Sequence, residues 1–261
     1  MTRLVLGGAG ADNHTMDHED AARYAETTGE LLVRLREQAD EADAWSRWEI
    51  GDEGDFQANR HLLELLHAEH PDDVVFSEES ADDRRRLDAD RVWIIDPLDG
   101  TREFTEPGRV DWAVHVALWE RGCGITAGAV ALPALAIVAA TANPPTVPPR
   151  VDRPPRIVVS RTRPPMSAHW VARALDGELV PMGSAGAKTM AVVLGDADAY
   201  VHSGGQYEWD SAAPTVVAAT GGFHVSRLDG SPLEYNRADP YVPDLLVCRP
   251  ELADAVLAAV R

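Results

Sequence analysis

Lysine, cysteine and long apolar runs are all scarce in this chain. Of its 24 basic residues a single one is lysine, Lys188, and 43 acidic residues leave a formal net charge of −19 over 261 residues. A surface of that sign repels the phosphates of nucleic acids and of anionic lipids. We therefore expect no nucleic-acid polymer and no membrane among the partners.

The two cysteines, Cys123 and Cys248, lie far apart in the sequence. This spacing argues against a disulfide framework and against a thiolate zinc site, and we expect free thiols. No apolar run reaches the length of about 18 residues that a membrane helix needs, and the first ten residues lack the basic cluster and apolar stretch of a secretory signal. The expected location is the cytoplasm.

An apolar run of strand type, Val92–Ile95, leads directly into the acidic turn Asp96–Gly100. Pro97 favours an extended Asp96, and Gly100 lets the chain turn, so the two aspartates of the turn should face one point. Aspartate often caps turns, which is the simpler alternative. Two anionic groups held this close, however, need a cation between them, and hard oxygen ligands favour Mg²⁺ or Mn²⁺ over zinc.

Two further segments place carboxylates after strand-like or before helix-like residues. The run Asp73–Ser77 ends in Glu78 and Glu79, and Asp210 lies at the start of a small-residue segment of helical character. The stretches Trp93–Thr101 and Trp209–Ala213 resemble the two signatures of the inositol monophosphatase superfamily, whose members are Mg²⁺-dependent, lithium-sensitive phosphatases. The similarity extends over nearly the whole chain, from about residue 17 onward.

The resemblance implies a phosphomonoesterase with two or three Mg²⁺ ions, for which Mn²⁺ could substitute. The metal ligands that it implies are Glu78, Asp96, the carbonyl of Leu98, Asp99 and Asp210. Two metals would activate the attacking water and stabilise the departing oxygen. Thr101, Glu78 and Asp55 would together act as the general base. Asp55 also fits the N-cap of a helix predicted from Phe56 to Glu69, which is its simpler interpretation.

The expected contacts to a small phosphate substrate follow from the same resemblance. Backbone N–H groups of Gly100 and Thr101 would bind the phosphate, as anion nests and helix N-termini do. The segment Gly183–Lys188 is similar to the Gly-Ser-x-x-x-Lys segment of the nucleotide-directed branch, with a plain surface lysine as the alternative for Lys188. The substrate-binding residues expected are Asp99, Gly100, Thr101, Ser184, Lys188 and Asp210.

The substrate class is decided by two positions. In the inositol enzymes a glutamate about seven residues before the Trp-Asp signature binds inositol hydroxyls, whereas this chain has Ser203 there. Together with Lys188, this favours the CysQ-type branch, the 3′(2′),5′-bisphosphate nucleotidases. We expect adenosine 3′,5′-bisphosphate to be converted to AMP, and its 5′-phosphosulfate analogue to adenosine 5′-phosphosulfate. Broad action on inositol monophosphates or fructose 1,6-bisphosphate is the alternative, and a catalytically silent scaffold is a third hypothesis.

The remaining pattern predicts two lobes. Strand-like runs over residues 112–141, separated by glycine and proline turns, favour an antiparallel meander, and alternating strands and helices follow from Arg156. Residues 143–155, with six of the 18 prolines, would connect an α+β lobe at 15–142, carrying most metal ligands, to an α/β lobe at 156–261 that completes the site. The resemblance implies a layered α-β-α-β-α sandwich and leaves a homodimer open.

Overall fold

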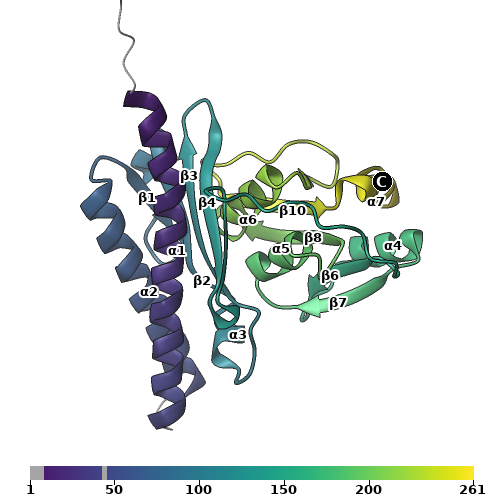
Figure 1. The fold of residues 1–261 in the computed structure, drawn as a ribbon, viewed down its shortest axis with the longest axis horizontal. Helices are drawn as coiled ribbons and strands as arrows, with labels where there is room; N and C mark the ends of the chain where they lie inside the picture. Colours follow the sequence, from purple (N-terminus) through teal and green to yellow (C-terminus); the bar gives the residue numbers. More distant parts are fainter. Residues whose placement is uncertain (1–8, 43–45) are drawn as a thin grey trace, which may run out of the picture.

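The structure is a computed structural model that describes the backbone of residues 9–42 and 46–261 and the side chains of residues 15–39 and 46–261. Helices and sheets alternate in layers, as Figure 1 shows. Helices α1 (Ala9–Ala42) and α2 (Arg47–Glu69) cover the outer face of a first sheet. Helices α5 (Ala185–Val193) and α6 (Glu208–Thr220) separate that sheet from a second one. Helices α4 (Met166–Leu175) and α7 (Ala253–Ala259) cover the far side, which confirms the α-β-α-β-α sandwich.

The first sheet has the order β1-β2-β3-β4-β5. Its strands are β1 (Val74–Ser77), β2 (Arg91–Asp99), β3 (Ala113–Glu120), β4 (Gly124–Leu132) and β5 (Ile137–Ala140). Strand β1 runs parallel to β2, whereas each later neighbour is antiparallel to the strand before it. The predicted meander over residues 112–141 is therefore confirmed, with a short 3-10 turn at Pro133–Leu135 between β4 and β5.

The second sheet has the order β7-β6-β8-β10-β9. Its strands are β6 (Arg156–Ser160), β7 (Glu178–Met182), β8 (Ala199–Tyr207), β9 (His224–Ser226) and β10 (Tyr241–Cys248). Strands β7 and β8 pair with β6 in parallel, and the other pairs are antiparallel. The sequence pattern does not predict β9, because three residues are too few for an alternation to be visible.

The start of α2 contradicts the expectation that Asp55 caps a helix beginning at Phe56. Ser46 is the N-cap: its hydroxyl accepts from the backbone N–H of Glu49 at 3.3 Å, and the Glu49 carboxylate accepts from the N–H of Ser46 at 2.8 Å. Asp55 consequently lies in the middle of α2. Glycine is needed at position 54, because a Cβ there would lie 2.9 Å from the ring of Phe104. The absence of a Cβ allows α2 to approach the turn after β2.

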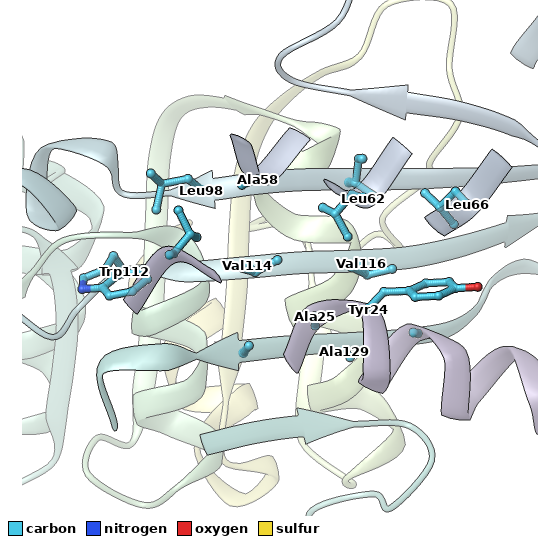
Figure 2. Packing of buried hydrophobic residues seen from close by; sticks show 14 of the residues in the cluster. Tyr24, Ala25, Ala58, Leu62, Leu66, Leu98, Trp112, Val114, Val116 and Ala129 are labelled. Carbon is cyan, nitrogen blue, oxygen red and sulfur yellow. The ribbon is translucent and has the colours of Figure 1, made fainter. Parts of the chain in front are cut away.

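Three apolar layers of side chains hold the sandwich together. Figure 2 shows the outer one, which combines Leu62 and Leu66 of α2 and Tyr24 of α1 with Val114 and Val116 of β3. The middle layer joins both sheets through α5 and α6, and the third lies between the second sheet, α4 and α7. Removing this much apolar surface from water is the main favourable term in the folding of a chain of this size.

Residues 144–155 contain no helix or strand. The middle layer includes Val130 from before this segment and Val158 from after it, so both predicted lobes contribute to one core. The division of the chain at 143–155 stays a prediction. Within the described ranges, no helix has both the length and the apolar composition that crossing a bilayer requires.

A buried arginine fastens the loop before β10 to the segment before β2. Arg86 is 0% exposed, its Nε donates to Asp82 Oδ1 at 2.6 Å, and its Nη1 donates to Asn236 Oδ1 at 2.9 Å. The guanidinium also lies 4.0 Å from the centre of the Phe76 ring. One side chain thus satisfies polar groups from segments 150 residues apart.

We predict that Arg86→Met lowers the free energy of unfolding by roughly 2–4 kcal/mol, because it leaves buried acceptors without their donor. Urea unfolding followed by circular dichroism measures the change. The matched control is Arg85→Met, whose side chain is 85% exposed and pairs with Asp83, and which should leave the urea midpoint nearly unchanged. Equal midpoints for the two variants would show that the buried network stabilises nothing.

Candidate functional site

Carboxylates from three segments meet where β1 and β2 end and α6 begins. Glu78 directly follows β1, Asp96 and Asp99 lie at the end of β2, and Asp210 lies in the first turn of α6. Parallel strands end at the same edge of a sheet, and the N–H of Glu78 donates to the carbonyl of Ile95 at 3.3 Å. One carboxylate oxygen from each of the three aspartates lies within 4.8 Å of the other two.

Burial and mutual repulsion make this cluster unfavourable in its fully charged form. Burial raises the pKa of Glu78 to about 8, and the negative charge of Asp210 adds to the shift. Burial also raises the pKa of Asp210 to about 6, and that of Asp96 lies well above its ordinary value for the same reason, reinforced by Glu78. The group therefore requires protons or a cation.

The donor set of the cluster fits a divalent cation. Asp96 is 1% exposed, and among the described residues its Oδ2 has no hydrogen-bond partner. A buried carboxylate oxygen without a hydrogen bond costs free energy, which coordination of a cation would recover. Carboxylate oxygens are also the ligands that hard divalent cations prefer. The cluster of Asp96, Asp99 and Asp210 can therefore hold a metal ion.

Asp99 differs from its neighbours because it already has positive and donor partners. Its Oδ2 accepts from the Ser184 hydroxyl at 2.5 Å and from the Gly186 N–H at 2.7 Å, and lies 3.2 Å from His115 Nε2. Burial alone would raise the pKa of Asp99, but His115, the positive charge of Lys188 and the Ser184 hydroxyl lower it to about 2. Asp99 is thus an anion at neutral pH even without a metal.

His115 is a site residue that the sequence analysis does not identify. It lies on β3 opposite Asp96, is 0% exposed, and its Nδ1 lies 3.0 Å from the carbonyl oxygen of Trp209. Burial would lower its pKa, yet Asp99 raises it above the ordinary value. A Cβ on Gly186 would lie 2.0 Å from His115 Nε2, so a glycine is needed here. The available sequence signal is a single histidine within the apolar run Ala113–Trp119, and such a histidine can equally be a structural core residue.

The turn after β2 brings Thr101 and Asp55 together. Gly100 has φ +90°, which glycine adopts without strain, and α3 (Thr101–Thr105) starts after it. The Thr101 hydroxyl donates to Asp55 Oδ1 at 3.1 Å and lies 3.3 Å from the carbonyl oxygen of Leu98. Burial raises the pKa of Asp55 to about 7, with a further contribution from Glu79.

Glu78, Asp55 and Thr101 line one cavity of about 570 Å³. The three residues of the predicted general base are therefore neighbours. Their catalytic role, the ligand role of the Leu98 carbonyl and the phosphate contacts of Gly100 and Thr101 stay predictions.

Ser184 and Lys188 are both buried beside this cluster. Lys188 is 5% exposed, which excludes the plain surface lysine, and its Nζ donates to the carbonyl of Ser184 at 2.6 Å and to that of Gly183 at 3.2 Å. Burial lowers the pKa of Lys188, and Asp99 opposes the shift. The ammonium lies 5.3 Å from the centre of the Tyr200 ring. Contact of Ser184 and Lys188 with a nucleotide stays a prediction.

Comparison with known proteins places this geometry in a family. A model of the inositol monophosphatase family matches residues 21–146 and 151–261. A protein named 3′-phosphoadenosine 5′-phosphate phosphatase from Mycobacterium tuberculosis is 53% identical over 239 residues, 89% of this chain and 88% of that protein. The 3′(2′),5′-bisphosphate nucleotidase CysQ of Escherichia coli is 26% identical over 237 residues, 86% of this chain and 96% of that protein.

Solved structures share the fold at lower identity. The crystal structure of CysQ from Bacteroides thetaiotaomicron, described as a bacterial member of the inositol monophosphatase family, has a TM-score of 0.77 at 23% identity and covers 93% of this chain and 99% of that one. The family model spans both sheets and every carboxylate of the cluster. This chain therefore belongs to the inositol monophosphatase family.

Proposed function

We propose that this chain hydrolyses the 3′-phosphate of adenosine 3′,5′-bisphosphate, giving AMP and inorganic phosphate, with Mg²⁺ held by the carboxylate cluster. The observation that carries the proposal is the 53% identity over 89% of the chain to the mycobacterial 3′-phosphoadenosine 5′-phosphate phosphatase. The chain is accordingly an enzyme of the CysQ nucleotidase type. The second substrate that we propose is the 5′-phosphosulfate analogue of adenosine 3′,5′-bisphosphate.

Mg²⁺ is the proposed ion because the cluster offers hard oxygen donors and no thiolate. Glu78, Asp96, the Leu98 carbonyl, Asp99 and Asp210 would hold two or three such ions, and Mn²⁺ would substitute. Once bound, the cation supplies Lewis-acid stabilisation of phosphate charge and makes a coordinated water easier to deprotonate. Because the chain carries a formal net charge of −19, the site would repel an anionic substrate unless positive charge offset its carboxylates.

The proton transfer is assigned to groups of the chain itself. The Thr101 hydroxyl donates to Asp55, whose pKa of about 7 lets it exchange a proton near neutral pH. Because Asp55 accepts a hydrogen bond from the Thr101 hydroxyl, the lone pairs of the Thr101 oxygen remain free to accept a hydrogen bond from the attacking water and to orient that water. Water can therefore attack directly, so that the reaction needs no serine or cysteine nucleophile.

The substrate assignment predicts a preference that can be measured directly. With Mg²⁺, kcat/KM for adenosine 3′,5′-bisphosphate should exceed that for myo-inositol 1-phosphate and for fructose 1,6-bisphosphate by at least about tenfold, because the extra nucleotide contacts stabilise its transition state. EDTA should abolish phosphate release from all three. If a sugar phosphate is turned over as well as the nucleotide, the substrate assignment is wrong and only the reaction class, phosphomonoester hydrolysis, is kept.

Neutralising one carboxylate of the cluster should separate stability from function. In Asp96→Asn the repulsion is reduced, so the metal-free protein should melt at a higher temperature, whereas kcat/KM should fall by at least about a hundredfold because a ligand is lost. The control is Asp90→Asn, whose side chain is 88% exposed and pairs with Arg121, and which should change neither quantity. Full activity in Asp96→Asn would exclude the cluster as the metal site.

The raised pKa values predict the pH dependence of metal binding. In the metal-free protein Glu78 titrates near 8 rather than near 4.5, so it holds a proton below about pH 8. A cation must displace that proton, and Mg²⁺ affinity should rise from about pH 6 to about pH 8, by up to about tenfold per unit for each proton released.

The same shift fixes how the stability of the metal-free protein depends on pH. Because the folded state holds the Glu78 proton more tightly than the unfolded chain does, this stability should fall as pH rises from about 4.5 to about 8.

The pH dependence of metal binding is measured by isothermal titration calorimetry across that pH range. Buffers of different ionisation enthalpy report both the Mg²⁺ affinity and the number of protons released. A pH-independent affinity would contradict the assignment of Glu78 to the cluster.

A further inference from the structure

Ser184 has a backbone conformation that residues other than glycine rarely adopt. Its φ is +50° and its ψ is 133°, a strained combination that persists where the surroundings enforce it. The conformation directs the hydroxyl to two partners: it donates to Asp99 Oδ2 at 2.5 Å and accepts from the Ala187 N–H at 2.9 Å. The strained residue therefore fixes a carboxylate of the cluster.

The surroundings that enforce it come from the segment after α3. Asp111 is 9% exposed, and its Oδ2 accepts from the Gly183 N–H at 2.6 Å, directly before the strained residue. Arg109 binds the same carboxylate, with Nε donating to Oδ1 at 2.8 Å. A Cβ at Gly100 would lie 3.1 Å from Ser184 Cβ and 3.3 Å from the Asp111 carbonyl oxygen. The turn at Gly100 is therefore in close contact with both Ser184 and Asp111.

Glu103 makes a second contact with the Gly183 backbone. A Cβ on Gly183 would lie 2.2 Å from the carboxyl carbon of Glu103, so Glu103 packs directly on the backbone there. Arg161, which follows β6, donates from Nε to Glu103 Oε1 at 2.5 Å and from Nη2 to Glu106 Oε1 at 2.7 Å. Residues next to the first sheet thus hold two segments of the second sheet in place.

We propose that Asp111 is a positioning residue for the metal cluster. Its carboxylate holds the Gly183 backbone, which keeps Ser184 in its strained conformation. The Ser184 hydroxyl and the Gly186 N–H then fix Asp99 for cation binding. This inference rests on the part of the proposed function that assigns a cation to the cluster. Groups that orient a metal ligand change cation affinity by roughly 10–100-fold when removed.

The alternative is that Asp111 only stabilises the fold, and the chain contains a matched control for it. Asp244 accepts from Arg227 at 2.8 and 2.7 Å and from the Leu228 N–H at 2.8 Å. It therefore has the same kinds of partner as Asp111, one arginine and one backbone amide. Asp244 does not belong to the carboxylate cluster.

The experiment compares Asp111→Ala with Asp244→Ala in the full-length protein, using calorimetric Mn²⁺ binding without substrate and urea unfolding. Asp111→Ala should weaken Mn²⁺ binding by about 10–100-fold and Asp244→Ala by less than about twofold, while both lower the urea midpoint. Equal Mn²⁺ affinities in the two variants would overturn the proposal. Wild-type protein that binds no Mn²⁺ would instead overturn the cation assignment itself.

Two further variants test the route of the effect, and the first of them does not depend on whether Asp111→Ala folds. Asp111→Asn retains an oxygen that can accept from the Gly183 N–H, so its Mn²⁺ affinity should stay within about threefold of wild type. In a Ser184→Ala background, Asp111→Ala should weaken binding by less than about threefold more, because the hydroxyl that it positions is gone. Additive losses, or an asparagine variant as defective as alanine, would refute positioning through Ser184.

Discussion

Repulsion among buried carboxylates is the constraint on which the rest of this structure depends. Glu78, Asp96 and Asp210 are held close together near the end of a parallel strand pair, and their pKa values are raised first by burial and then by the neighbouring negative charges. The layers of apolar side chains on both faces of the first sheet supply the stability that permits it. A cluster of this kind can hold a cation, which would offset that repulsion.

Asp99 is treated differently from the other carboxylates, and the difference has a geometric origin. It lies where β3 and the start of α5 converge, so His115, Ser184 and Gly186 can all reach one of its oxygens. Burial without such donors raises a carboxyl pKa, whereas burial with them lowers it. Neighbouring aspartates in one turn thus differ in pKa before any ligand arrives, and the low pKa of Asp99 keeps that residue ionised at neutral pH.

Arginine performs most of the structural work that lysine shares in other proteins. Arg86 and Arg161 each bind a carboxylate together with a further group, and Arg227 binds both oxygens of Asp244, which the planar, multiply donating guanidinium suits. Arg161 thereby joins segments 58 residues apart in the sequence, and Arg86 reaches a side chain 150 residues away. Lys188, the single lysine, is buried with its ammonium on backbone carbonyls. The large negative charge of the chain is therefore compatible with a tightly connected interior.

The sequence alone determined every strand except β9, most of the helices, the layered architecture and the carboxylates of the site, because periodicity, turn residues and family signatures are local properties. The tertiary structure decided that α2 begins at Arg47, that Lys188 is buried, and that His115 and Asp111 adjoin the cluster. Each of these depends on contacts between segments far apart in the chain. Residue spacing carries no information about such contacts until the layers have packed together.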